Sequence, residues 1–114
     1  MTEPLHLAVW EFQVKPESLA EFELIYGPGG RWSQLFRRSS AYLGTELLRQ
    51  ADRAGRYLTI DRWTSGEALR QFKQRHAEEY AALDKLCEQL TAEESLLGDF
   101  ESIQPYPSQD PDQQ

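Results

Sequence analysis

The chain has few of the side chains that build disulfides, metal centres or nucleic-acid interfaces. Its 114 residues contain one cysteine, Cys87, and two histidines, His6 and His76. A single cysteine excludes an intrachain disulfide, and two separated histidines give no metal-ligand spacing. The 19 acidic residues outnumber the 12 basic ones, for a net charge of −7. This balance disfavours nucleic acid and anionic membranes as partners.

Long apolar runs are also missing. No stretch approaches the ~20 apolar residues of a membrane span, and the first residues, MTEPLHLAVW, lack the basic and apolar regions of a signal peptide. We therefore expect a cytoplasmic protein that does not associate with membranes. The length suits one compact domain, which we place at residues 1–103. Residues 104–114, QPYPSQDPDQQ, are rich in proline and polar residues and are expected to form a mobile tail.

What is present is a regular alternation of strand and helix patterns. Apolar and β-branched runs predict four strands, and apolar residues at helical spacing predict the helices between them. Strands are expected over residues 6–14, 41–50, 56–63 and 96–103. Helices are expected over 16–26 and 31–38, and a short helical turn over 91–95. The short loop between the second and third strands predicts a β-hairpin.

A long helix is predicted to begin after Thr64, which has capping-box spacing with Glu67. One apolar stripe runs continuously along it, at steps of three and four residues. The stripe comprises Leu69, Phe72, His76, Tyr80, Leu83, Cys87 and Leu90. The order β-α-β-β-α-β predicts an α+β, ferredoxin-like fold in which both helices cover one side of a four-stranded antiparallel sheet.

The stretch YGPGGRW, residues 26–32, is the one glycine-dense segment. A phosphate-binding P-loop follows a strand and ends in Gly-Lys-Ser/Thr, whereas this segment follows a helix, lacks lysine and is interrupted by Pro28. No G-x-G-x-x-G fingerprint of a dinucleotide site is present either. Gly27 and Pro28 are therefore predicted to stop the helix.

Both faces of the predicted sheet carry large apolar side chains. Leu7 and Val9 alternate with Trp10 and Phe12 along the first strand. Helices can cover only one face, so we expect a second copy of the sheet to cover the other and form a homodimer. Trp10 and Phe12 are predicted to lie in the core of that dimer interface.

Three segments carry a resemblance to a known family. YLGTELLR before the hairpin, RYLTIDRW after it and TSGEALRQFKQRHAEEYAAL in the long helix resemble the antibiotic biosynthesis monooxygenase domain family. The resemblance covers residues 6–103 and implies a dimeric α/β barrel of two ferredoxin-like subunits. Some members of the family oxidise polyphenolic or anthrone-like substrates with O₂ and no cofactor, and others bind and degrade heme.

The resemblance implies no cofactor for this chain and a small aromatic or polyketide-like substrate. Heme degraders use an asparagine, a tryptophan and a histidine together. The sequence contains no asparagine, so that triad is incomplete here, although Trp63 matches the tryptophan position. There are two alternative functions. The chain could be a non-catalytic, stress-related binding protein that uses the same pocket, or it could bind heme through His76.

His76 is the predicted catalytic base. A histidine in a pocket can take the proton of a phenol and leave an electron-rich phenolate that reacts with O₂. The alternative is a buried histidine hydrogen-bonded to a carboxylate or a carbonyl. The residues predicted to bind the substrate are Trp63, Trp32, Phe72, Tyr80, Asp61, Thr59 and Glu11.

Each of these has a structural alternative. Trp63 and Trp32 are equally consistent with core packing. The polar strand residues Glu11, Thr59 and Asp61 are costly to bury unless they are paired, and neighbouring arginines are available as cross-strand partners. Cys87 continues the apolar stripe and is predicted to be a small buried hydrophobe.

Overall fold

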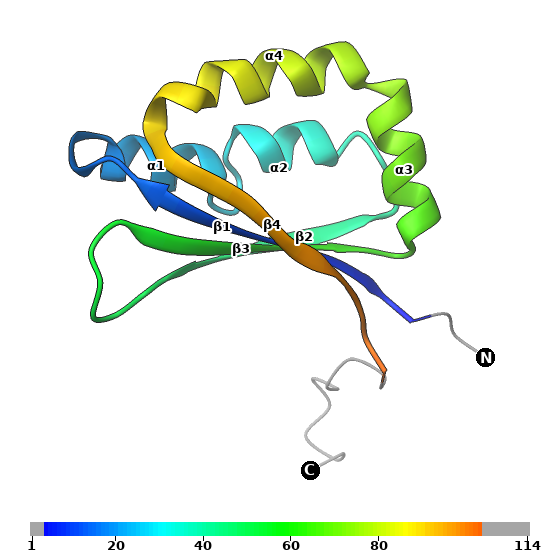
Figure 1. The fold of residues 1–114 in the computed structure, drawn as a ribbon. Coiled ribbons are helices and arrows are strands. Elements are labelled where there is room, and N and C mark those ends of the chain that lie inside the picture. Colours follow the sequence, from blue (N-terminus) through cyan, green and yellow to red (C-terminus); the bar gives the residue numbers. More distant parts are fainter. Residues whose placement is uncertain (1–3, 104–114) are drawn as a thin grey trace.

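The computed structural model describes residues 4–103 and has the βαββαβ order (Figure 1). The strands are β1 (His6–Val14), β2 (Tyr42–Arg49), β3 (Arg56–Trp63) and β4 (Thr91–Glu101). They form one antiparallel sheet in the order β2-β3-β1-β4. The ferredoxin-like α+β fold is confirmed. The tail expected over residues 104–114 lies outside the described residues.

The helices lie together over one face of the sheet (Figure 1). The first connection contains the 3₁₀ turn η1 (Pro16–Ser18), α1 (Leu19–Tyr26) and α2 (Arg31–Phe36). The second contains α3 (Gly66–Arg75), α4 (Ala77–Cys87) and the 3₁₀ turn η2 (Glu88–Leu90). Within residues 4–103, none of these helices has the length and apolar character needed to cross a bilayer.

Aromatic rings fill most of the space between the sheet and the helices. Phe12 of β1 packs edge-on against Phe22 and Tyr26 of α1, with ring centroids 5.1 and 4.9 Å apart. At the other end of the layer, Trp63 is fully buried, and its ring lies 5.3 Å from that of Phe72. Such ring pairs contribute about 0.5–1.5 kcal/mol each beyond the burial of their area.

Trp10 and Phe12 belong to this helix-facing layer, so their predicted place in a dimer interface is wrong. The antiparallel register pairs Trp10 with Thr59 and Phe12 with Tyr57. Paired residues share a face, and Tyr57 and Thr59 are both buried under the helices. The opposite face of β1 carries Leu7 and Val9, as the alternation predicts.

The long helix predicted after Thr64 is two helices. His76 has φ −114° and ψ 32°, outside helical values, and separates α3 from α4. The two helices meet at a clear angle in Figure 1, so the apolar stripe does not continue straight through the break. The cap is also one residue later than predicted, because Ser65 Oγ accepts the Ala68 N–H at 3.1 Å.

Strand β4 begins earlier than predicted. Residues 91–95, expected as a helical turn, are already part of the strand, and η2 precedes them. Strand propensity in this acidic stretch is low, yet pairing with β1 supplies its backbone hydrogen bonds and overrides that preference. The register shifts between Val9 and Trp10, which marks a β-bulge.

The glycine-dense segment is a tight turn between α1 and α2, as a helix stop requires. The Gly27 N–H donates to the Glu23 carbonyl, and Gly29 has φ +83°, a left-handed value. At Gly30 a Cβ atom would lie 2.4 Å from the carbonyl oxygens of Leu24 and Ile25. The turn therefore needs glycine at position 30, where the backbone of α1 comes closest.

We expect Gly30→Ala to destabilise the fold by about 2–4 kcal/mol, because the added methyl group collides with two rigid backbone carbonyls. Urea denaturation followed by circular dichroism measures the loss. Pro28→Ala, in the exposed part of the same turn, is the matched control and should change stability by less than about 1 kcal/mol. A Gly30→Ala midpoint equal to that of the control would contradict the close approach.

Candidate functional site

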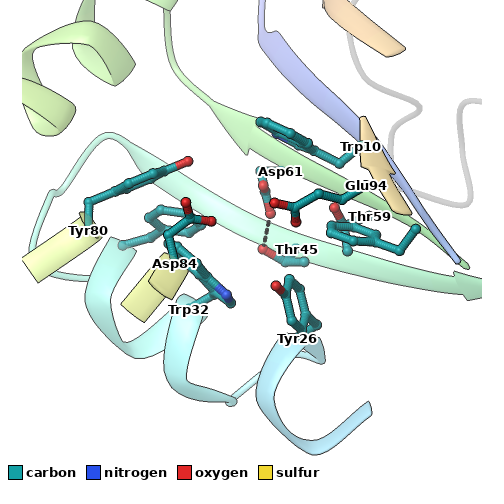
Figure 2. A pocket seen from close by; sticks show the side chains of 11 residues that line it. Trp10, Tyr26, Trp32, Thr45, Thr59, Asp61, Tyr80, Asp84 and Glu94 are labelled. Atoms are coloured by element: carbon teal, nitrogen blue, oxygen red, sulfur yellow. Dashed lines mark hydrogen bonds between the residues drawn. The ribbon is translucent and has the colours of Figure 1, made fainter. Parts of the chain in front are cut away.

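A small aromatic pocket, with a cavity volume of about 40 Å³, lies between the sheet and the helices and is partly open to solvent. Its walls come from all four strands and from α1, α2 and α4 (Figure 2). The lining residues are Trp10, Phe12, Tyr26, Trp32, Phe36, Thr45, Thr59, Asp61, Tyr80, Asp84 and Glu94. Six aromatic rings and three carboxylates in one concave site are typical of a ligand pocket with a few polar groups.

Asp61 is a half-buried carboxylate of this pocket. It projects from β3 toward the helices, and Thr45 Oγ1 of β2 donates to Asp61 Oδ1 at 2.6 Å. Burial raises the pKa of Asp61 to about 6, although the Thr45 hydrogen bond and the charge of Lys73 act in the opposite direction. Asp61 is therefore a carboxylate that can both hold and release a proton near neutral pH.

A chain of hydroxyl groups links Asp61 to the turn between α1 and α2. The Tyr42 hydroxyl hydrogen-bonds Thr45 Oγ1 and lies 3.1 Å from Ser33 Oγ. Ser33 Oγ in turn donates to the Gly27 carbonyl at 3.4 Å. Because Thr45 donates its one proton to Asp61, the chain orients Thr45 and fixes the carboxylate within the pocket.

Two tyrosine hydroxyls line the pocket as well. Burial, together with the charges of Asp84, Asp61 and Glu94, raises the pKa of Tyr80 to about 12. Burial likewise raises the pKa of Tyr26, far above its ordinary value. Both groups therefore keep their protons at neutral pH and can donate hydrogen bonds to a bound molecule.

Asp84 of α4 and Glu94 of β4 carry the other two carboxylates. Figure 2 shows their carboxylate groups pointing toward one another on the same side of the pocket. Burial and then the charges of Asp84 and Glu88 raise the pKa of Glu94. The negative charge of Glu94 in the pocket is thus repelled by the neighbouring carboxylates of Asp84 and Glu88.

The structure brings four of the predicted substrate-binding residues together. Trp32, Tyr80, Asp61 and Thr59 all line the aromatic pocket, and the rings of Trp32 and Tyr80 pack edge-on with centroids 4.9 Å apart. Thr59 is nearly inaccessible beneath Trp10 and Phe12 on the neighbouring strand.

The other three predicted substrate-binding residues lie elsewhere. Trp63 is fully buried beside Phe36 and Phe72, so it is a core residue and does not reach the pocket. Phe72 borders a different depression, near the end of α3. Glu11 points to the opposite face of the sheet, where its carboxylate accepts a hydrogen bond from Arg56 at 2.5 Å.

His76 does not line the aromatic pocket. It borders the depression near Ser39 and Arg75, its ring packs 4.8 Å from that of Phe72, and Nδ1 lies 3.2 Å from Glu79 Oε1. The Tyr80 N–H donates to the His76 carbonyl at 2.9 Å, yet the two side chains border different depressions. The geometry matches the alternative of a histidine paired with a carboxylate, and it gives no support to heme ligation from within the pocket.

Sequence reasoning missed seven of the lining residues: Trp10, Phe12, Tyr26, Phe36, Thr45, Asp84 and Glu94. Pairing β1 against β3 would have placed Trp10 beside Thr59, since Thr59 and Asp61 were already expected to share a face. No local pattern marks Asp84 or Glu94, because the first lies in a polar part of α4 and the second in a stretch that resembles a helical turn. Cys87 is buried with a raised pKa, mainly through burial, as expected for a small core residue.

Comparison with known proteins gives one family and several solved structures that share one fold. The family model described as antibiotic biosynthesis monooxygenase matches residues 6–83. Among solved structures, SnoaB from Streptomyces nogalater, a cofactor-independent oxygenase, is 24% identical with a TM-score of 0.71, covering 94% of this chain and 100% of SnoaB. No curated protein sequence matches the chain.

Two further solved structures share the fold. A Bordetella bronchiseptica protein described as a candidate antibiotic biosynthesis monooxygenase is 19% identical, with a TM-score of 0.72 over 90% of this chain and all of that one. A similarly described protein from Nitrosomonas europaea is 14% identical, with a TM-score of 0.70 over 95% of this chain and 97% of that one. At these identities the similarity establishes the fold alone.

We expect Asp61→Asn to make stability less dependent on pH. Folded Asp61 keeps its proton up to about pH 6, whereas an aspartate in an unfolded chain loses it near pH 4. The stability from this group is therefore present below pH 4 and is lost as the pH rises through 6. Relative to the wild type, Asp61→Asn should gain about 1–3 kcal/mol between pH 4 and pH 7.5.

Urea denaturation at the two pH values, at one protein concentration, measures this difference. Asp52→Asn, which removes an exposed carboxylate in the β2–β3 hairpin, is the control and should follow the wild type. Equal pH dependence of Asp61→Asn and wild type would show that Asp61 has an ordinary pKa.

Proposed function

Since the chain belongs to the antibiotic biosynthesis monooxygenase family, we propose that it is a cofactor-independent oxygenase acting on a small aromatic or polyketide-like molecule. The substrate would bind in the aromatic pocket between the sheet and the helices. The observation that carries this proposal is Asp61, a proton-accepting carboxylate set among the aromatic walls of a pocket that is partly open to solvent.

Asp61 replaces His76 as the proposed base, because it lines the pocket and His76 does not. A general base works best when its pKa lies near the operating pH, and that of Asp61 is about 6. Thr45 holds one oxygen, Oδ1, which leaves the second oxygen available to take a proton. The Asp61 carboxylate is therefore both positioned and poised for taking a phenolic or benzylic proton.

The chemistry needs no electron source other than the substrate. Loss of a proton to Asp61 leaves an electron-rich anion, which transfers an electron to O₂ more readily than the neutral molecule does. Recombination forms a C–O bond and, after protonation, a hydroperoxide. Loss of water from the hydroperoxide leaves a ketone, so one oxygen atom enters the product and the other leaves as water. The substrate supplies all four electrons.

The remaining pocket residues would hold the substrate. Trp32 and Tyr80 provide ring faces and edges, and Thr59 borders the floor on the sheet. The protonated hydroxyls of Tyr26 and Tyr80 can donate hydrogen bonds to carbonyl oxygens of the ligand. A non-catalytic binding protein would use the same contacts, so O₂ consumption is the measurement that separates the two functions.

We further propose that the protein is a homodimer through the sheet face opposite the helices. This face carries Leu7, Val9, Leu58, Ile60, Leu48 and Phe100 by alternation and register. Leu48 and Phe100 are 38% and 51% exposed in the single chain. Ion pairs of Glu11 with Arg56 and of Glu46 with Arg62 flank the apolar side chains, a pattern typical of an apolar interface with a polar rim.

Oxygen uptake with a panel of dihydroxyaromatics and anthrones tests the oxygenase proposal. Asp61→Asn should lower kcat/KM by about 10²–10⁴-fold through loss of the base, while His76→Ala should keep wild-type activity. Wild-type kcat/KM should rise with pH through about 6, as Asp61 loses its proton, and Asp61→Asn should lack this rise. Activity that survives in Asp61→Asn but disappears in His76→Ala would reverse the assignment.

Sedimentation analysis tests the dimer. Ile60→Arg places a charge in the middle of the proposed apolar interface and should convert a micromolar dimer to a monomer. Leu24→Arg, which changes a leucine that is 77% exposed on α1, is the control and should leave the dimer intact. A monomeric wild type at micromolar concentration would contradict the proposal.

A further inference from the structure

We infer that the molecule bound in the aromatic pocket carries a protonated amine beside its aromatic rings and no carboxylate. This inference rests on the proposed function for the location of the site and adds the charge of the ligand. It depends on two features of the same cavity, which are carboxylates without a cationic partner and the faces of aromatic rings.

The first observation is the charge of the pocket. Asp61, Asp84 and Glu94 line it, and within the part of the chain that the structure describes no lysine, arginine or histidine does. Neither the Asp84 carboxylate nor the Glu94 carboxylate makes a hydrogen bond or an ion pair with any residue from 4 to 103. Two carboxylates on one side of a half-enclosed pocket repel each other, and a cation between them would remove that repulsion.

The second observation is the wall that these carboxylates adjoin. Trp10, Trp32, Tyr26 and Tyr80 surround the same space (Figure 2). Electron-rich ring faces attract ammonium groups, tryptophan most strongly, and the attraction grows as the site excludes water. Aromatic rings with adjoining carboxylates are the combination that recognises an alkylammonium group, whereas a carboxylate ligand would be repelled by both.

The cations around the pocket do not neutralise this pair. Glu94 also borders a second depression with Arg53 and Arg56. Arg56 is already paired with Glu11, and neither arginine contributes to the pKa shift of Glu94. Lys73 lies outside the pocket with Nζ 5.5 Å from the centroid of the Tyr80 ring, and its charge acts on Asp61. Arg31 acts on Cys87, behind the wall of the pocket. On the other side, Glu88 adds further negative charge near Glu94. The charged groups facing Asp84 and Glu94 therefore leave a net attraction for a cation.

Binding of three matched naphthalene compounds tests the inference. 2-(1-Naphthyl)ethylamine, 1-naphthylacetamide and 1-naphthylacetate share the ring system and are cationic, neutral and anionic at pH 7.5. Isothermal titration calorimetry of the full chain gives their Kd values, and none of them needs turnover to be measured. We expect the amine to bind at least about tenfold more tightly than the amide, and the acetate more weakly than either.

Glu94→Gln and Asp84→Asn should each reduce the preference for the amine over the amide by about threefold or more, and added salt should reduce it in the wild type. Glu93→Gln is the matched control, because it removes the same charge from the adjacent residue of β4, which pairs with Gln13 on the opposite face of the sheet. Circular dichroism verifies the fold of each variant.

The outcomes separate this inference from the oxygenase proposal. Preference for the amine that is lost in Glu94→Gln and kept in Glu93→Gln supports the inference even if no compound supports O₂ uptake. The inference would be overturned by equal binding of the three compounds, by tighter binding of the acetate or the amide, or by no binding of any compound. An unchanged preference for the amine in both Asp84→Asn and Glu94→Gln would also overturn it. These outcomes count whether or not O₂ is consumed with phenolic substrates.

Discussion

The antiparallel register of the sheet decides which side chains can meet. Because Trp10 lies opposite Thr59 and Ala8 opposite Asp61, alternation brings the large rings of β1 and the polar residues of β3 to the same, helix-covered face. Asp61 reaches its hydrogen-bond donor because β2 is in register as well, with Thr45 directly opposite. A slip of one residue in either pairing would turn Asp61 or its partners to the other face and remove the pocket.

Two turns in the helical layer shape the space above that face. The Gly27–Gly30 turn ends α1 and starts α2, and it directs Trp32 into the pocket. The break at His76 reorients α4, which brings Tyr80 and Asp84 over the sheet while His76 remains beside Phe72. The cavity thus exists where the rings of α1, α2 and α4 meet without filling the space between them.

Carboxylates are paired differently on the outer face of the sheet and in the aromatic pocket. On the outer face two carboxylates have arginine partners, Arg56 for the half-buried Glu11 and Arg62 for Glu46. In the aromatic pocket Asp61 has a hydroxyl donor, and the carboxylates of Asp84 on α4 and Glu94 on β4 have no partner among residues 4–103. Paired charges suit a surface that packs against protein, whereas unpaired charges suit a surface that binds a small molecule.

The sequence by itself determined the first three strands, the hairpin, the ferredoxin-like order and the helix stop at Gly27, because these follow from local periodicity and turn chemistry. It also placed Thr59, Asp61, Trp32 and Tyr80 in a site, since each combines a telling residue type with its position in an element. Only the tertiary structure decided which depression His76 borders and the side on which Trp10 and Phe12 lie. Both depend on long-range geometry, a helix break in one case and the choice of the face covered by helices in the other. Asp84 and Glu94 are ten positions apart in the sequence and lie on different elements. They meet only through the β1–β4 register and the path of α4, and no local pattern encodes that meeting.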